Sequence, residues 1–231
     1  MKKALLVVGI TAGVWMACDQ EVTNPQPGIP VPRFVAAAAD TAVEERGIDA
    51  VPEEDAIFLQ WHHNPELAGF QLFRRFEGEK NFSLVAVLTA LDSSFFDRVP
   101  TDLRCYYFLR GLDEEERLGA PSDTVDYMLL AKAFDLQVTP GEPLLFSWST
   151  GLMRPAFYLL RLHEESSGTP VWIGRMAPGY QGTRESTPYN SDGRAALPRL
   201  QSGVLYRWRL DCVGAAARTG SESAWQRFTL Y

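Results

Sequence analysis

The sequence predicts an all-β chain that folds into two tandem sandwiches of antiparallel strands. From Ile48 onward, apolar and polar residues alternate in short runs separated by turns, which is the period of strands with one buried face. After Cys18, no stretch sustains a long helical repeat. The strand pattern also occurs twice, and each copy has the size of such a sandwich, about 80 to 100 residues.

Composition limits the classes of function. Apolar residues make up 46% of the 231 residues, so sizeable cores can be buried. The chain has 22 Lys and Arg against 29 Asp and Glu, a net charge of -7. A nucleic-acid partner needs a basic face to neutralise its phosphates, so we expect none.

Residues 1–17 predict an export signal. Lys2 and Lys3 precede the uncharged run from Ala4 to Met16, which is long enough for the apolar region of a signal peptide and too short to cross a bilayer comfortably. The alternative is a buried helix or strand of the fold.

The end of this run, Ala17-Cys18, resembles the lipobox of bacterial lipoproteins, although Trp15 and Met16 depart from the preferences of that family. The resemblance implies cleavage before Cys18 and a diacylglyceryl group on its thiol. Two or more acyl chains hold a protein stably on a membrane. We therefore expect a protein of the bacterial cell envelope, exported from the cytoplasm and lipid-anchored at Cys18, with the outer and cytoplasmic membranes both open as its location.

Residues 18–46 are predicted to be a flexible tether that starts at the lipidated cysteine. Its prolines forbid a helix and favour extended polyproline II structure, and they are Pro25, Pro27, Pro30 and Pro32. The alternative is a proline-rich ligand for the aromatic groove of a partner.

The first sandwich is expected over residues 47–130 and the second over 131–231. The corresponding strands are Ile57 to Trp61 with Leu144 to Trp148, Gly69 to Arg75 with Ala156 to Arg161, Phe82 to Leu88 with Val171 to Ile173, and Cys105 to Leu112 with Tyr206 to Val213. The junction from Tyr127 to Phe134 is apolar and lacks Gly and Pro, so we expect it to be packed and stiff.

The run Leu200 to Tyr206 resembles the Leu-x-Pro-Gly-x-x-Tyr motif of fibronectin type III domains, with Ser202 in place of Pro. The resemblance implies two immunoglobulin-like sandwiches, with Trp61, Trp148 and Tyr206 as structural signature residues and Tyr206 at a tyrosine corner. In the first half, Cys105 stands where the corner Tyr would be. Either that hydrogen bond is missing or the register is shifted by one.

Cys105 and Cys212 are then expected on equivalent strands of separate sandwiches. A disulfide needs Cα atoms within about 7 Å of one another. We predict two buried free thiols that act as small apolar residues. The alternative is a bridge between the domains.

No set of residues predicts an enzyme. His62 and His63 alternate across a strand end, and His163 enters a polar turn. Ser147 and Ser149 lack the glycines of a nucleophile elbow, and no phosphate-binding loop or His-Glu-x-x-His motif occurs. We expect no catalytic residue, no metal site and no cofactor. The hypothesis of a degradative enzyme is disfavoured, because the sequence offers no set of candidate catalytic residues.

Two loops differ from ordinary turns. The stretch from Ala177 to Gly193 is long, and Tyr180, Arg184 and Tyr189 make it a candidate partner-binding loop. Asp113 to Arg117 could attract a cation or a basic partner, and the alternative is a solvated hairpin tip.

The sequence therefore predicts a non-catalytic, monomeric, lipid-anchored envelope protein. Its two sandwiches would present loops to a protein or polysaccharide, in binding or adhesion. The alternative is a structural or assembly accessory subunit of an envelope complex.

Overall fold

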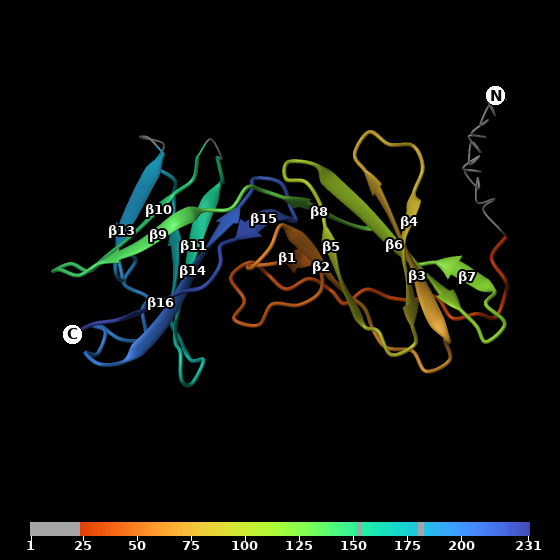
Figure 1. Cartoon of the computed structure of the whole chain (residues 1–231), viewed down its shortest axis with the longest axis horizontal. Helices are drawn as coiled ribbons and strands as arrows, with labels where there is room; N and C mark the ends of the chain where they lie inside the picture. Colours follow the sequence, from red (N-terminus) through yellow and green to blue (C-terminus); the bar gives the residue numbers. More distant parts are fainter. Residues whose placement is uncertain (1–23, 152–153, 180–182) are drawn as a thin grey trace, which may run out of the picture.

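The computed structural model describes residues 24–151, 154–179 and 183–231, and it contains strands and no helix over these residues. Two sandwiches lie end to end (Figure 1). The strands of domain 1 are β1 (Asp49–Ala50), β2 (Ala56–Gln60), β3 (Gly69–Phe76), β4 (Ser83–Thr89), β5 (Ser94–Arg98), β6 (Arg104–Leu112), β7 (Leu118–Pro121) and β8 (Val125–Leu129). Those of domain 2 are β9 (Phe134–Thr139), β10 (Leu145–Ser149), β11 (Phe157–Glu164), β12 (Pro170–Met176), β13 (Arg184–Pro188), β14 (Leu205–Val213), β15 (Thr219–Glu222) and β16 (Gln226–Thr229).

Both domains have the same strand order. In domain 1 the sheet β1-β2-β5 faces the sheet β4-β3-β6-β8, and in domain 2 the sheet β9-β10-β13 faces β12-β11-β14 with β15 and β16. This is the arrangement of a fibronectin type III sandwich, and it confirms the predicted all-β fold of two immunoglobulin-like domains. In the described part of the chain, no helix is long and apolar enough to cross a membrane.

The repeat continues to the level of single hydrogen bonds. The hydroxyl of Ser122 accepts from the backbone N–H of Leu109 at 3.0 Å, and that of Ser223 accepts from Leu210 at 2.9 Å. Both the serines and their partners are 101 positions apart (223 − 122 and 210 − 109). On β3 and β11 the expected correspondence is wrong by one residue. Phe70 is the counterpart of Tyr158, not of Phe157, and both side chains are fully buried.

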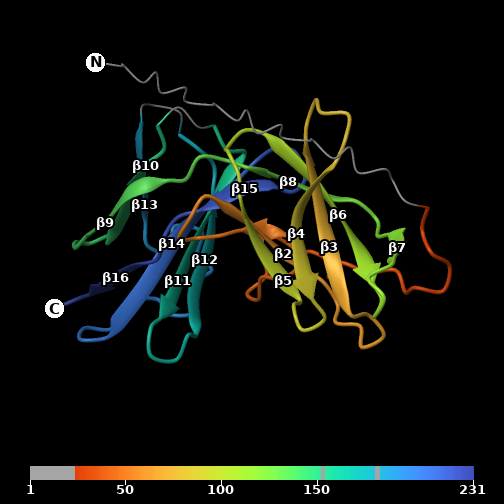
Figure 2. The same cartoon turned by 45° about the vertical axis from the view of Figure 1, so that its right-hand side comes forward.

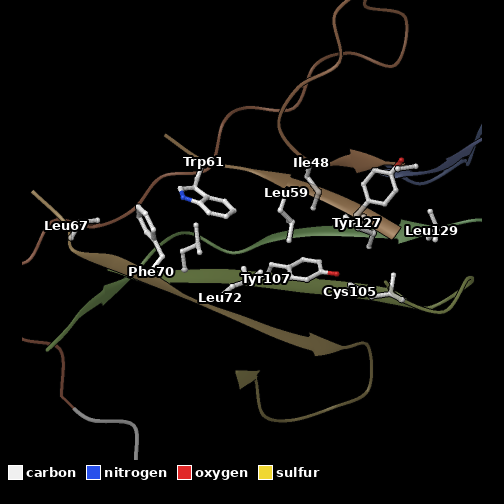
Figure 3. Packing of buried hydrophobic residues seen from close by; sticks show 14 residues of the cluster. Ile48, Leu59, Trp61, Leu67, Phe70, Leu72, Cys105, Tyr107, Tyr127 and Leu129 are labelled. Carbon is white, nitrogen blue, oxygen red and sulfur yellow. The ribbon is translucent and has the colours of Figure 1, made fainter. Parts of the chain in front are cut away.

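Each sandwich encloses one apolar core. In domain 1 the Trp61 indole packs edge-on against Phe70 with ring centroids 5.7 Å apart, and its N–H donates to the carbonyl of Asp92 (Figure 3). In domain 2 the Phe146 ring lies at the centre of three aromatic contacts, with Trp172, Trp208 and Phe228. Trp148 is buried beside Tyr158. Trp61 and Trp148 thus occupy the core positions predicted for them.

The segment after Asn24 corrects the expected tether. We call residues 26–46 the strap, because it runs along domain 1 to the domain junction (Figure 1). The N–H of Gln26 donates to Leu118, the N–H of Val35 donates to Gln60, and Phe34 forms a bridge with Trp61. Backbone groups of the strap thus bond to domain 1, whereas those of a free polyproline segment would bond to water. Cys18 and the start of the predicted tether lie outside the described residues.

Candidate functional site

The two domains are joined by a pair of parallel strands. β8 of domain 1 and β15 of domain 2 pair with Met128 opposite Thr219 and Leu129 opposite Gly220, so one sheet of each domain becomes a single ten-stranded sheet. Figures 1 and 2 both show β8 and β15 side by side at the middle of the molecule. A Cβ on Gly220 would lie 3.0 Å from the carbonyl oxygen of Cys212, so the close approach favours glycine. The expected packed junction is confirmed.

Beside this strand pair lies a buried ionic cluster around Arg209 of β14. Its side chain is 2% exposed and donates to Asp211 at 2.9 Å and to Glu222 at 2.7 Å. It also pairs with Glu45 of the strap and lies 5.0 Å from the ring centroid of Trp225. Three carboxylates thus converge on one guanidinium, and they come from the strap, β14 and β15.

Arg161 of β11 ties the strap to the same cluster. Its Nε donates to Asp211 at 2.5 Å, and its two terminal nitrogens donate to the carbonyl oxygens of Ala42 and Asp40. Arg161 also lies 3.1 Å from a carboxylate oxygen of Glu45. The strap therefore satisfies donors of a buried charged side chain, which is what makes burial of that charge tolerable.

Burial and neighbouring charges shift the pKa values of groups in and near the cluster. Desolvation lowers the pKa of Arg209, but the negative charges of Asp211, Glu222 and Glu45 outweigh it and raise that pKa overall. Burial, and then the charge of Asp211, raises the pKa of Glu222. Burial raises the pKa of Asp49, at the strap end of domain 1, to about 6. The Asp49 carboxylate accepts from the hydroxyl of Tyr127 at 3.2 Å.

Lys132, in the linker between β8 and β9, bonds to residues of both domains at the junction. Its ammonium donates to the backbone carbonyls of Val51, Pro52 and Glu222, which belong to both domains. Burial lowers the pKa of this lysine. Since an ammonium has three protons, the three carbonyls satisfy it fully.

The three carboxylates of the cluster have the spacing of a metal site. One oxygen from each of Glu45, Asp211 and Glu222 lies within 4.8 Å of the others. The guanidinium of Arg209 contacts all three and already supplies their positive charge. The arrangement holds the strap, β14 and β15 together around one guanidinium.

Sequence reasoning did not identify these junction residues. β14 places Arg207, Arg209 and Asp211 at alternate positions between core residues. Such alternation is typical of an antiparallel strand with one face in the core and the other in water. The sequence pattern therefore gives no sign that the strap covers this face.

The candidate partner-binding loop is more ordered than expected. Residues 184–188 form β13, which pairs with β10 as an edge strand. Tyr189 packs edge-on against Trp172, its hydroxyl donates to the carbonyl of Leu197 at 2.7 Å, and burial raises its pKa to about 12. Arg184 is exposed and pairs with Asp135. Tyr180 lies outside the described residues, so partner binding by this loop stays a prediction.

The corner tyrosine and the two cysteines are the remaining residues with predicted structural roles. The hydroxyl of Tyr206 accepts from the backbone N–H of Gln201 at 3.0 Å, which confirms the tyrosine corner. Cys105 occupies the same place in domain 1, where that bond is missing. Instead Tyr107, two residues on, donates to the buried Asp97. Cys105 and Cys212 are both free and buried, as predicted.

The histidines differ in their burial. His63 contacts the carbonyl of Ala90 at the surface. His163 was expected in a polar turn but lies buried in β11 against Trp225, and burial lowers its pKa. At the tip between β6 and β7, Asp113 accepts from the backbone of Glu115 and Arg117, as a hairpin turn does.

No protein family matches the chain, and no curated protein matches it. A two-domain fibronectin type III segment of chicken tenascin is 15% identical over 86% of this chain and 98% of its own, with a TM-score of 0.35. The FN1–FN3 domains of chicken CNTN1 are 14% identical over 87% of this chain and 68% of theirs, also with a TM-score of 0.35. A beta-1,2-glucanase from Parabacteroides distasonis is 19% identical over 44% of this chain and 14% of its own, with a TM-score of 0.32.

Proposed function

We propose that the chain is a non-catalytic, lipid-anchored protein of a bacterial cell envelope that presents two sandwiches as one stiff unit to a protein or polysaccharide partner. The observation that carries the proposal is the junction. Parallel pairing of β8 with β15 and the buried Arg209 cluster fix the angle between the domains, which a flexible linker would leave free. A fixed angle sets the position of distant loops relative to the anchor.

The proposed anchor rests on Cys18. The sequence before it has the charge and length of an export signal, and Ala17 provides the small residue before the cysteine. The strap then carries the chain along domain 1 to the junction. The proposed spacer between lipid and first domain is therefore short.

The test combines cell fractionation with protease treatment of intact cells. Wild-type protein should partition with membranes and incorporate labelled palmitate, and Cys18→Ser should lose both properties. Cys105→Ala is the matched control, because that thiol is buried and its loss should leave both unchanged. Wild-type protein in the soluble fraction would refute the anchor. Digestion of the intact cells' protein would place it facing outward.

A structural or assembly subunit is the second candidate, and the same stiff junction favours it. The two readings differ in stoichiometry. A subunit should co-purify with one complex in a constant ratio after mild detergent extraction. A protein that presents loops to a surface partner should instead purify alone from washed membranes.

A further inference from the structure

The outer face of the sheet β9-β10-β13 carries a cluster of polar side chains. Core residues of β10 alternate with Ser147 and Ser149, so these two serines face outward. Ser147 lies opposite Gln137 of β9, and Ser149 lies opposite Arg184 of β13. Figures 1 and 2 both show this sheet at the end of the molecule opposite to the first described residues.

Arg184 holds this polar cluster together. Its guanidinium reaches across β10 to β9, where it donates to a carboxylate oxygen of Asp135 at 2.6 Å and to the side-chain oxygen of Gln137 at 2.7 Å. It also donates to the hydroxyl of Ser147 at 2.9 Å, and the Gln137 amide donates to Asp135 at 3.1 Å. The four side chains thus fix one another on an open surface.

A β-bulge brings Asp135 into the cluster. The register of β9 shifts against β10 so that Asp135 and Leu136 together lie opposite Trp148. Asp135 has a φ of 53°, in the left-handed region that non-glycine residues seldom adopt. Bulges often re-aim a side chain beside a functional site. Since an exposed ion pair contributes little to stability, stability is a weak explanation for this geometry.

An exposed aromatic ring borders the polar cluster. Phe134, the residue before the bulge, lies opposite Ser149 and is 56% exposed. It stands in the same row as Arg184, with Cα atoms two strand spacings apart, about 10 Å. Within the described residues, Phe134 is the one strongly exposed large apolar side chain of this sheet. The face therefore offers one apolar ring beside a network of polar groups.

The charges and hydrogen-bonding groups of the cluster favour a neutral ligand with many hydroxyls. The carboxylate of Asp135 cancels the charge of Arg184, and the whole chain is acidic, net -7, so an anionic ligand gains little. The bonds described above use three of the five N–H donors of Arg184, and the carboxylate oxygens of Asp135 keep lone pairs. A sugar hydroxyl both donates and accepts, so it matches a surface that offers donors and acceptors together.

The exposed ring favours a sugar over a protein surface. The C–H groups on one face of a pyranose ring pack against the negative face of an aromatic ring. A protein interface instead needs a core of several buried apolar side chains, and this face supplies Phe134 alone among the described residues. The small side chains of Ser147, Ser149 and Ser186 leave the middle of the face shallow, which suits an extended polysaccharide.

We propose that the outer face of β9-β10-β13 binds a neutral polysaccharide, with one sugar ring against Phe134 and neighbouring hydroxyls bonded to Arg184, Asp135 and Gln137. The inference deepens the proposed function and rests on it, because it selects the polysaccharide as the partner. It also places the contact at the end of the molecule away from the proposed anchor.

The test is native affinity electrophoresis of the full chain in gels that contain a polysaccharide. The neutral probes are laminarin, xylan, galactomannan, dextran and the neutral glycan fraction of the cells that make the protein, and polygalacturonate is the charged comparison. All proteins carry Cys18→Ser, so that no lipid contributes. We expect at least one neutral probe to retard the chain in proportion to its concentration. A chain that no neutral probe retards overturns the proposal, and so does one that prefers polygalacturonate.

Two substitutions locate the binding. Arg184→Met and Phe134→Ser should each raise the apparent Kd for the neutral probe at least tenfold. The matched controls are Arg98→Met and Phe96→Ser in domain 1, where Arg98 pairs with Glu54 at the surface and the Phe96 ring is 52% exposed. Both controls should bind as the parent chain does. Controls that lose binding equally, or domain 2 variants that keep it, would show that the site lies elsewhere.

Phe134→Trp provides a direct signal and a rescue. An indole can still stack on a sugar, so this variant should bind at least as tightly as the parent chain. Its exposed indole should also shift its fluorescence to shorter wavelength when the polysaccharide covers it, whereas the parent chain should show no shift. Binding without such a shift would refute the placement at Phe134.

Failure of this inference is distinguishable from failure of the proposed function. Membrane fractionation tests the anchor at Cys18, and co-purification tests a protein partner or a complex. Neither measurement depends on Phe134 or Arg184. A chain that is membrane-bound and binds no neutral polysaccharide would therefore lose this inference and keep the anchor.

Discussion

Arg209 in domain 2 forms an ion pair with Glu45 of the strap, a residue 164 positions earlier in the chain. The whole of domain 1 lies between these two residues in the sequence, yet their side chains meet beside the β8–β15 junction. It means that the strap belongs structurally to both domains. The stiffness that we attribute to this protein depends on this contact and its neighbours.

Replacing Arg209 by Met should destabilise domain 2 strongly. The change leaves the buried carboxylates of Asp211 and Glu222 without their main counter-charge, and loss of one partner from a buried ion cluster costs about 3 to 5 kcal/mol. Urea unfolding followed by tryptophan fluorescence measures the loss. Arg199→Ala is the matched control. That residue pairs with Glu142 where both side chains are over four-fifths exposed, so its cost should stay below about 1 kcal/mol. Equal effects of the two changes would contradict the role of the cluster.

Asp49 should make the protein less stable as pH rises from about 4 to 6. Its pKa is raised from 3.8 to about 6 in the fold, so the folded state binds more protons than the unfolded state in this window. Asp49→Asn removes this contribution. The difference in unfolding free energy, wild type minus Asp49→Asn, should therefore fall across the window. Asp102→Asn, an exposed change in the turn before β6, is the control. A flat difference would refute the assignment.

Tyr206→Phe should cost about 1 to 2 kcal/mol, because the backbone N–H of Gln201 loses its acceptor while the ring is kept. Chemical denaturation provides the measurement. In Tyr106→Phe the ring still lies beneath the guanidinium of Arg75, and the expected cost is within about 0.5 kcal/mol. If Tyr206→Phe were as mild as Tyr106→Phe, the corner hydrogen bond would contribute little to this domain.

The strap should resist trypsin although it contains the exposed residues Arg33 and Arg46. The carbonyl of Arg33 accepts from His62, and that of Arg46 accepts from Ala38, so the protease must first pull both segments free. Peptide mapping over time should show cleavage at both sites no faster than at sites within the domains. Immediate cleavage at Arg33 and Arg46, with both domains intact, would restore the flexible tether.

The fold was predictable where the sequence pattern is local. Trp61, Trp148 and Tyr206 lie as their motifs indicate, because strand alternation and turn residues act over a few positions. The strand β13 was missed because Arg184 to Pro188 buries only Thr187, and so it shows no apolar alternation. The one-residue error at Phe70 has a similar origin, since Phe157 and Tyr158 are adjacent aromatic residues and only pairing with β14 separates them.

The junction was not predictable in the same way. The partners of Arg209 come from the strap, β14 and β15, and the proline content of the strap is equally typical of a free linker. Only the three-dimensional path of residues 26–46 brings Glu45 to Arg209. The loop residues Arg184 and Tyr189 show the reverse case, because a polar, tyrosine-containing segment suggested exposure where one ring supports the core.

The strap has a consequence for the order of folding. Residues 40–45 are made early, but the arginines that bind them belong to β11 and β14, more than a hundred positions later. Domain 1 can therefore complete its own core while the end of the strap waits for a partner not yet available. Contacts of such long sequence separation form slowly. Closure of the strap over domain 2 should be the last event in the folding of this chain, and until then Arg209 on the outer face of β14 stays open to solvent.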